Sequence, residues 1–527
     1  MTTRPGRQAP IGEIVLKSGP DLNLNDKNLS YFTRKTMPIT LSPMNRLSGL
    51  LLSLLLALHS TAALSQSQSD FDQLPDLGDA SGQAISPQQD IALGKAFMRQ
   101  VRQSGLILDD QEVNSYLEAL GSKLASYSEN PGHSFTFFLV DDPSINAFAG
   151  PGGYIGVNVG LFVTAESESE LAGVMAHEIA HVTQRHLARR FDAADKMSLP
   201  TTAAILAAIL IGATTDGSAG AAALTAASAA SMQYQINFTR ANEYEADRVG
   251  IQTLADAGFD PYGMPQFFER LQKNSKLYGT RPPEFLSTHP VTTNRIAEAT
   301  SRAETYPRKP DYTNLDFLLL RAKLRVKSYK DPKQVLADLQ RYQGESGGDT
   351  PAEKYEFALL LAANGRFAQA ETVIQKLQKA DPDRITYRLA LADILRDGKQ
   401  PDKALAVYKD ALAVYPDNMA VALPYATTLM DTGQEEMAYQ LLSDVTTNHR
   451  ENAKAYKLLA QAAGATGHKV QTHTAMSQYY FLNGFTNQAI EQLKLAEKQP
   501  GLNDYLTARI QARITDLEAL LEAEKLE

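Results

Sequence analysis

Residues 177–181 read His-Glu-Ile-Ala-His, an HExxH sequence inside a segment of helical pattern over 166–190. That segment begins with acidic residues and ends with basic ones, as the helix dipole favours. Residues four apart on a helix differ by about 40° and about 6 Å, so both imidazoles project toward one point. This spacing suits two nitrogen ligands of a tetrahedral zinc. Glu178 lies about 100° around the helix from His177, which suits a general base beside the metal.

Two histidines leave such a metal site incomplete, and the chain has no cysteine to add. The third ligand must therefore be a His, Glu or Asp side chain. Residues 243–247 read Glu-Tyr-Glu-Ala-Asp in a predicted helix over 237–257, where Glu243 and Asp247 share a face and Glu245 points elsewhere. One of the two acids would bind zinc, and the other would orient a ligating imidazole through its N–H. Without the upstream motif, these acids would indicate only a solvated helix face.

The composition excludes several classes of protein. The chain has 527 residues, which predicts more than one domain. Its net charge of −9 gives no basic footprint for nucleic acid. The lack of cysteine excludes a disulfide scaffold, a cysteine nucleophile and a thiolate metal site. A hydrophobic content of 43% is typical of globular domains, and a mean hydropathy of −0.27 argues against a polytopic membrane protein.

The amino-terminal region predicts export. Residues 47–58 read LSGLLLSLLLAL, follow Arg46 and precede a small-residue stretch with cleavage expected after Ala63 or Ser65. We therefore interpret 44–65 as a signal peptide that starts at Met44, and 1–43 as a non-native extension; an uncleaved signal anchor is the alternative. The apolar stretch is short for a membrane span. Residues 66–88 indicate a linker.

Periodicity after the linker predicts a mixed domain over 89–305. Two helices are expected over 89–127, a strand over 134–140, a loop over 141–148 and a second strand over 152–162. Residues 199–232 are apolar and Ala-rich and predict a helical hairpin. That hairpin would either contact a membrane surface or lie buried, for example as a flap over the active site.

Residues 314–527 have a helical pattern with a 34-residue period. The positions that repeat are a small residue (Ala370, Ala404, Ala438), a preceding glycine (Gly365, Gly398, Gly433) and a proline (Pro382, Pro416). This period is typical of tetratricopeptide repeats, with an ordinary helical bundle as the alternative. The next turn, Gly484, and its small residue Ala489 come one and a half periods later, so one helix near 469–482 is expected to serve two units.

These motifs together resemble the gluzincin metallopeptidase family of the CAAX prenyl protease type, which includes periplasmic proteases with tetratricopeptide repeats. The resemblance rests on HEIAH, on EYEAD 62 residues after its last histidine, and on Ser-Thr-His-Pro at 287–290. It covers about 89–305 and extends over the repeats. It implies that Glu243 is the zinc ligand and that Asp247 supports a zinc-binding histidine.

The resemblance implies three further features of the site. His289 would occupy the open zinc position as a self-inhibiting plug, and Arg295 would stabilise the oxyanion. The segment 146–162 is similar to the family's edge-strand region, where an extended substrate pairs with free backbone groups. The residues expected on that strand are Gly153, Tyr154, Ile155, Gly156 and Val157. The other histidines, including His186, which the helical spacing rotates off the metal face, are expected to be structural or surface residues.

The sequence therefore predicts a mainly α protein: a zincin-like metalloprotease domain with a small β-sheet, then an α-solenoid of tetratricopeptide repeats. We expect a periplasmic endopeptidase with one zinc ion per chain. The resemblance implies that its substrates are unfolded, stalled or misassembled outer-membrane proteins. It also implies that the repeats bind the outer-membrane β-barrel assembly machinery. The alternatives are a chaperone or assembly factor with a closed metal site, and a protease anchored in the inner membrane.

Overall fold

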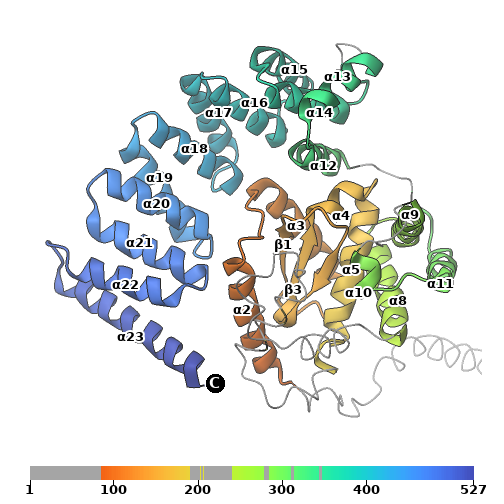
Figure 1. Ribbon diagram of the computed structural model, residues 1–527, viewed down its shortest axis with the longest axis horizontal. Helices are drawn as coiled ribbons and strands as arrows, with labels where there is room; N and C mark the ends of the chain where they lie inside the picture. The colour runs from red at the N-terminus through yellow and green to blue at the C-terminus, as the bar shows by residue number, and fades with distance from the viewer. Residues whose placement is uncertain are drawn as a thin grey trace, which may run out of the picture. The chain divides into compact units, whose positions relative to one another are not determined.

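The computed structural model describes residues 85–189, 240–277, 284–309, 314–343 and 347–526, together with Thr202 and Leu206 (Figure 1). The chain divides into a unit Met1–Leu77 and a unit Gly78–Glu527, and every described residue belongs to the second. The predicted extension 1–43, the signal peptide 44–65, most of the linker 66–88 and nearly all of the hairpin 199–232 lie outside the described residues. None of the described helices has the length and apolar character that crossing a membrane requires.

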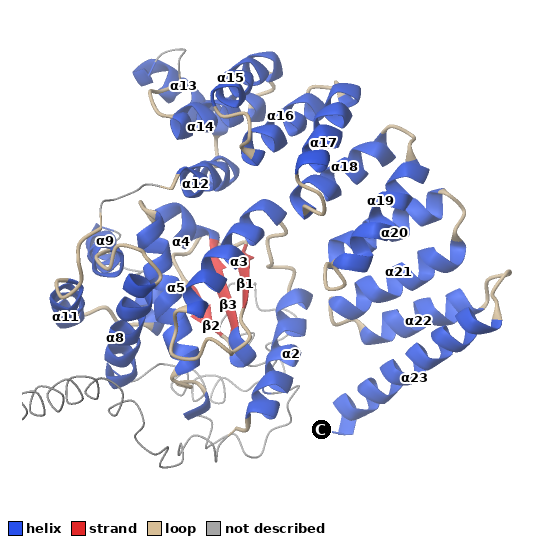
Figure 2. Ribbon diagram, turned by 180° about the vertical axis from the view of Figure 1, so that it is seen from behind, coloured by secondary structure: helices blue, strands red, loops and turns tan. Residues whose placement is uncertain are grey.

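A small sheet follows two helices at the start of the described chain (Figure 2, red). Its strands lie in the order β1-β3-β2, with β1 parallel and β2 antiparallel to β3. Gly156 stands opposite Phe148, and a side chain at Gly156 would collide with the Phe148 ring. The elements are α2 (Pro87–Gln103), α3 (Gln111–Ser126), β1 (Thr136–Val140), β2 (Ala147–Ala149), the 3-10 turn η2 (Pro151–Gly153) and β3 (Tyr154–Asn158).

The sheet order corrects two predictions. The expected substrate strand, residues 153–157, falls almost wholly in β3, and β3 is paired on both sides. Its N–H and C=O groups are therefore committed to β1 and β2, and it is not an edge strand. The edge strands are β1 and β2, and β2 lies largely in a segment where we expected a loop. Three residues are too few to show the alternation that predicts a strand. The second strand also ends earlier than predicted, because residues 159–164 form a helix.

A layer of helices covers the sheet and supplies the metal motifs. Helix α5 packs against α3, α8, α9 and strand β2. The core between these elements consists of aliphatic and aromatic side chains, among them Phe162, Phe267 and Phe268, which are fully buried. The helices are α4 (Val159–Thr164), α5 (Glu168–Thr183), α8 (Arg240–Asp256), α9 (Gly263–Leu277), α10 (Glu284–Thr288) and α11 (Thr293–Ala303).

The rest of the described chain is an array of helices in which α12 packs on α14 and, from α13 onward, each helix packs on the next. The predicted fold class is confirmed: a helical chain with a small sheet, followed by helical repeats. The helices are α12 (Leu315–Ser328), α13 (Pro332–Gln343), α14 (Pro351–Ala363), α15 (Phe367–Ala380), α16 (Ile385–Asp397), α17 (Pro401–Val414), α18 (Met419–Asp431), α19 (Glu435–Asn448), α20 (Ala453–Ala465), α21 (Lys469–Leu482), α22 (Thr486–Glu497) and α23 (Asp504–Leu526).

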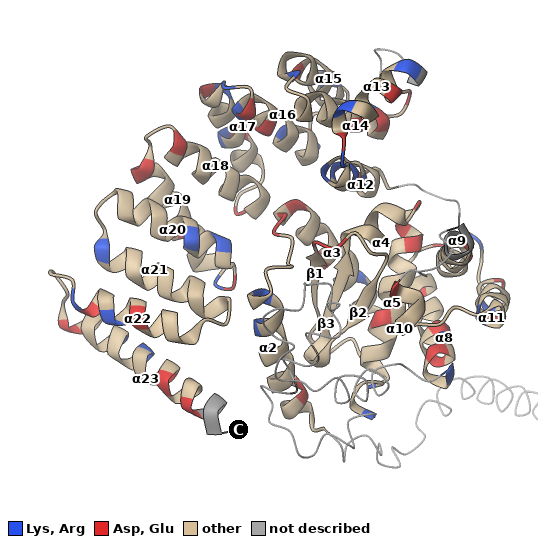
Figure 3. Ribbon diagram, in the orientation of Figure 1, with Lys and Arg blue, Asp and Glu red and all other residues tan. Residues whose placement is uncertain are grey.

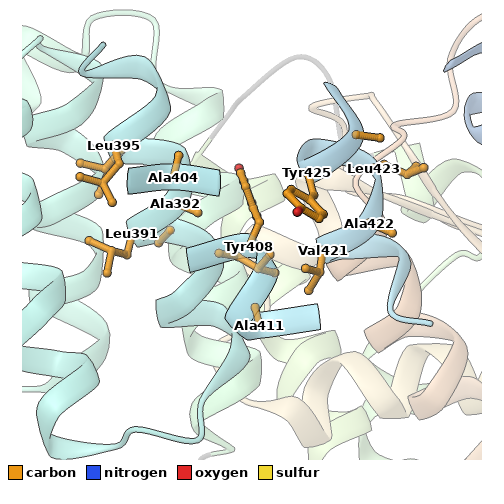
Figure 4. Packing of buried hydrophobic residues seen from close by; sticks show 14 of the residues in the cluster. Leu391, Ala392, Leu395, Ala404, Tyr408, Ala411, Val421, Ala422, Leu423 and Tyr425 are labelled. Carbon is orange, nitrogen blue, oxygen red and sulfur yellow. The ribbon is translucent and has the colours of Figure 1, made fainter. Parts of the chain in front are cut away.

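Small residues let the repeat helices approach closely. Ala370, Ala404 and Ala438, the periodic small positions, are completely buried. Figure 4 shows Ala404 on α17 facing the aliphatic side chains of α16, while the Tyr408 and Tyr425 rings fill the space toward α18. A larger side chain at these alanines would push two helices apart. The 34-residue period of small residues therefore corresponds to the points where paired helices cross.

In the turns between paired helices, the residue with positive φ repeats every 34 residues, even where the glycine is displaced by one position. Residues with positive φ occur at 365, 399, 433 and 467, each 34 after the last, and at Gly484 half a period later. At 399 the residue is lysine, and the glycine stands one position earlier. Helix α21 packs against both α20 and α22, as α14 to α20 also do with their neighbours, so the sharing of one helix by two units stays a prediction.

Ion pairs and hydrogen bonds join the repeats to the first helices. Lys323 and Lys327 on α12 bind Asp110, which caps α3. Arg102 on α2 donates to the Leu482 carbonyl at the end of α21. Figure 3 shows basic residues on α12 and at the upper end of α2.

Candidate metal centre

Helix α5 carries the HExxH motif through the centre of the core. Ser167 caps its first turn by accepting a hydrogen bond from the Glu170 N–H. Every residue from 170 to 181 is buried, polar ones included. A helix buried on all sides holds its side chains in fixed positions, so His177, Glu178 and His181 are pre-oriented by packing.

The structure brings together the four predicted metal ligands from three separate segments. Around His177 Nε2 lie His181 Nε2 at 3.0 Å, His289 Nδ1 at 3.4 Å and Glu243 Oε2 at 3.6 Å. Glu243 Oε1 is 3.5 Å from His181 Nε2 and 3.1 Å from His289 Nδ1. All four side chains are buried.

These distances fit a single tetrahedral ion. A zinc ion with bonds of about 2.0–2.1 Å separates its ligand atoms by about 3.3 Å. With Glu243 Oε2 as the oxygen ligand, four of the six separations among the ligand atoms lie between 3.0 and 3.6 Å. Three imidazoles and one carboxylate also suit a borderline ion such as zinc. The residues present therefore fit a mononuclear metal site.

Asp247 and Arg295 support two of these ligands. Asp247 Oδ1 lies 3.0 Å from His177 Nδ1, close although off the direct hydrogen-bond line. Arg295 donates to both oxygens of Asp247 at 2.7 Å, and its Nη1 lies 2.7 Å from Glu243 Oε2. Nη1 also donates to the Pro290 carbonyl. This geometry favours a guanidinium that holds the two acids in place over the predicted oxyanion role.

Electrostatics in the metal-free site follow from this pairing. Burial alone would lower the pKa of His177, but the close carboxylates of Asp247 and Glu243 outweigh it and raise that pKa to about 9. Burial likewise opposes the charged form of Glu243, yet the surrounding histidines hold its pKa well below the usual range. The site is therefore arranged to keep an anionic Glu243 among cations, which is also what a metal ligand needs.

Glu178 differs from the other acids in the site. It is completely buried, and among the described residues neither carboxylate oxygen has a well-formed hydrogen-bond partner. Burial raises its pKa, and the nearby His289, His177 and Ala149 N–H oppose that only in part. A carboxylate with a raised pKa and unused lone pairs is well suited to accept a proton.

His289 follows the short helix α10. The Phe285 N–H donates to the Ile145 carbonyl just before β2, and the Phe285 ring stacks on the His289 imidazole at 4.8 Å between centroids. The second ring nitrogen of His289, Nε2, lies 3.6 Å from Glu178 Oε1. The imidazole thus touches both the ligand cluster and Glu178.

The free edge of β2 faces the same site. The Asn146 carbonyl and the Gly150 N–H bond to β3, so in an antiparallel ladder the groups of Ala147 and Ala149 point the other way. The Ala149 N–H is close enough to Glu178 to favour its charged form. A cavity of about 340 Å³ continues from this point and is lined by residues of η2, α2 and the end of α5, including His181 and Gly150.

Two residues beside the ligands were not predicted. Helix α5 ends at Thr183 instead of running to residue 190, and His186 folds back to lie 2.8 Å from His181. His186 therefore stays out of the ligand cluster, as expected, but its contact with the rear of His181 was not predicted. Glu245, on the other face of α8, contacts His186. The turn at Arg185 has no glycine, so no residue pattern indicated it.

Comparison with known proteins matches both halves of the chain. Residues 111–303 match the family Peptidase family M48, and residues 395–500 match the Tetratricopeptide repeat family. The chain is 35% identical over 452 residues to the beta-barrel assembly-enhancing protease of Escherichia coli strain K12, covering 86% of this chain and 92% of that protein. The Yersinia pestis protein of the same name is 32% identical with similar coverage. The mitochondrial metalloendopeptidase OMA1 of Arabidopsis thaliana is 29% identical over 41% of each chain.

The long relatives span nearly the whole described chain, repeats included, and the family match spans every predicted metal ligand. The expectation of a metal-dependent peptidase followed by tetratricopeptide repeats is confirmed. This chain belongs to peptidase family M48, the metallopeptidases.

Proposed function

We propose that the protein is a zinc-dependent endopeptidase with one zinc ion held by His177, His181 and Glu243. The observation that carries this proposal is the tetrahedral spacing of the ligand atoms with Glu178 buried beside them. A bound zinc ion would polarise the scissile carbonyl and make a water molecule more acidic. Glu178 would accept the proton of that water and return it to the leaving amine.

The remaining residues of the site would hold this arrangement. Asp247 would keep the His177 imidazole oriented, and Arg295 would keep both Asp247 and Glu243 in position. Burial of the whole cluster excludes bulk water, so the charges act in a medium of low dielectric constant.

The substrate would bind as an extended peptide along β2. The outward backbone groups of Ala147 and Ala149 support this, since an edge strand pairs with an added strand through main-chain hydrogen bonds. Such a peptide would place its carbonyl near Glu178, which lies beside the Ala149 N–H. The cavity at the end of β2 would take a substrate side chain.

His289 would keep the resting enzyme latent. Its Nδ1 lies beside His177 Nε2 and Glu243 Oε1, where it would take the coordination position that a catalytic metal leaves for water. The same observation favours the second candidate function, a chaperone or assembly factor whose metal site stays closed. The two differ in whether His289 leaves the metal when substrate or a partner binds.

The protein would act in the periplasm after export by residues 44–65. There it would degrade unfolded or stalled outer-membrane proteins and bind the β-barrel assembly machinery through its repeats. The name of the Escherichia coli relative, beta-barrel assembly-enhancing protease, supports this setting, because the match covers 92% of that protein. Residues 199–232 would make any peripheral membrane contact.

Substitution of Glu178 tests the catalytic proposal. Glu178→Gln keeps the shape of the side chain but removes the base, so hydrolysis of an unfolded protein should fall by about 10²–10⁴-fold or more. Elemental analysis should still find about one zinc per chain. The double variant His177→Ala, Glu243→Ala should lose the metal. Near wild-type hydrolysis by Glu178→Gln would remove Glu178 from the mechanism.

Substitution of His289 separates the two candidate functions. If His289 is a plug, His289→Ala should retain zinc and raise basal proteolysis, with self-cleavage in exposed loops as one sign of it. A lower rate would instead mean that His289 helps bind the transition state. Unchanged activity would reject both roles.

A further inference from the structure

The chain turns sharply where the metal helix ends. After Thr183 the Arg185 N–H bonds to the Val182 carbonyl, and the His186 N–H bonds back to the His181 carbonyl at 3.0 Å. This is a C-terminal turn of the kind usually made by glycine, yet Arg185 occupies it with φ of 52°. A side chain in this left-handed conformation is unfavourable, so the turn must be held by other contacts. One of them joins the Arg185 guanidinium to the Ile85 carbonyl at 2.5 Å.

Because of this turn, His186 lies behind the predicted metal ligand His181. His186 is completely buried, and its Nδ1 lies 2.8 Å from His181 Nδ1. Its other nitrogen, Nε2, lies 3.0 Å from Glu245 Oε2 on α8. Glu245 is about one third exposed and also pairs with Arg189 at 3.3 Å.

The hydrogen positions along this line follow from the ligand geometry. His181 turns Nε2 toward the other ligand atoms, so that nitrogen must present a lone pair and Nδ1 must carry the hydrogen. The His181 Nδ1–H then donates to His186 Nδ1. His186 must therefore carry its own hydrogen on Nε2, which donates to the Glu245 carboxylate. Each donor meets one acceptor, and no other assignment satisfies both contacts with His181 bound through Nε2.

We propose that His186 and Glu245 are positioning residues that fix the tautomer and ring orientation of His181 for metal binding. The inference rests on the proposed metal site. Helix α8 would then contribute three acids to the site: Glu243 as a ligand, Asp247 behind His177, and Glu245 behind His181 through His186. The structural alternative is that His186 only fills space under α5.

Zinc affinity tests this proposal without relying on turnover. The full chain carrying Glu178→Gln, which prevents self-cleavage, serves as the parent. Zinc affinity is measured by competition with a chromophoric chelator. Residues that orient metal ligands typically contribute 10–100-fold in affinity, so His186→Leu in this parent should bind zinc about 10–100-fold more weakly. Replacement of zinc by cobalt should show a changed visible spectrum in the same variant, since the His181 ring is free to rotate.

Conservative variants distinguish orientation from packing. His186→Asn retains an acceptor oxygen near the His181 N–H and should recover part of the affinity lost in His186→Leu. Glu245→Gln retains an acceptor for His186 and should bind zinc more tightly than Glu245→Leu. Glu245 lies at the surface, so its variants report on orientation even if His186→Leu does not fold. His473→Leu, which removes a histidine hydrogen-bonded to Gln492 in the repeats, is the matched control and should leave affinity unchanged.

The outcomes separate this inference from the proposed function. If the parent binds no zinc, the proposed metal site fails and the positioning role fails with it. If the parent binds zinc and both His186→Leu and Glu245→Leu bind it equally well, only the positioning role is overturned. Equal affinities for His186→Asn and His186→Leu, both weakened, would show that His186 acts by packing and would also overturn the proposal.

Discussion

The two halves of the described chain differ in the polar side chains that they bury. In residues 85–309 the interior holds histidines, carboxylates and an arginine in one connected cluster. In residues 314–526 the buried polar residues are all threonines and serines, and the hydroxyls of Thr428 and Thr446 donate to a carbonyl one turn back. The repeats are therefore specified by side-chain size and spacing, whereas the metal centre depends on matched charges. The two regions should respond differently to the same substitution.

Loss of one arginine should show the largest contrast. Arg295→Met leaves the buried acids Glu243 and Asp247 without their cation, which should destabilise the metal-free protein by about 3–5 kcal/mol. Arg341→Met on α13 breaks a pair whose side chains are 68% and 42% exposed, and it should change stability by at most about 1 kcal/mol. Urea unfolding of the chelator-treated proteins measures both. Comparable losses for the two variants would contradict the distinction between the regions.

Asp110 offers an intermediate test, because it joins α3 to α12 by charge. Burial alone would raise the pKa of Asp110, but Lys323 and Lys327 outweigh it and lower that pKa well below 3.8. Stability from a depressed pKa is present above the unfolded value and is lost as the pH falls through the folded one. Asp110→Asn keeps the helix cap and should cost about 2 kcal/mol at pH 7, the size of a charge-assisted hydrogen bond.

The pH dependence identifies the cause of that loss. The difference in stability between wild type and Asp110→Asn should shrink as the pH falls below about 4, since protonation removes the same charge. Asp109→Asn, whose pair with Lys454 is 3.5 Å long and exposed, is the control and should have little effect. A difference that stays constant down to pH 2 would mean that the charge of Asp110 is not what holds α3 to α12.

The same contrast explains what could be read from the sequence. The repeats were predictable because their helix packing depends on local residue spacing. The alanine period corresponds to the helix crossings and can be found within a single continuous segment of the chain. The predicted ligands could be found because HExxH and ExxxD each place two groups on one helix face. Residues that act across segments gave no such signal. His186 reaches His181 only because the helix ends at an unusual arginine turn, and β2 is an edge strand only because β3 pairs on both sides.

The smallest effect on stability is expected at Lys399. The 34-residue period places the turn residue at 399, but the glycine of this turn stands one position earlier, at 398. Its φ of 60° matches the 74° of Gly365 and Gly433, which lie 34 residues before and after it. The turns also share their hydrogen bonds: Gln400 N–H to the Leu395 carbonyl at 2.9 Å corresponds to Gln434 N–H to the Leu429 carbonyl at 2.8 Å. Nothing lies within 4 Å of a Cβ built on Gly365 or Gly433, so backbone strain alone separates lysine from glycine there.

Lys399→Gly should therefore stabilise the protein by about 0.5–1 kcal/mol. A side chain in the left-handed region costs about 1–2 kcal/mol, and part of the gain is offset by the greater freedom of glycine in the unfolded chain. The reciprocal variant Gly433→Lys should destabilise by a similar amount. Thermal unfolding of both variants, with the double variant as a check on additivity, measures these shifts. If Lys399→Gly were destabilising, the lysine side chain would be making a stabilising contact in this turn, and the repeats would depend on more than size and spacing.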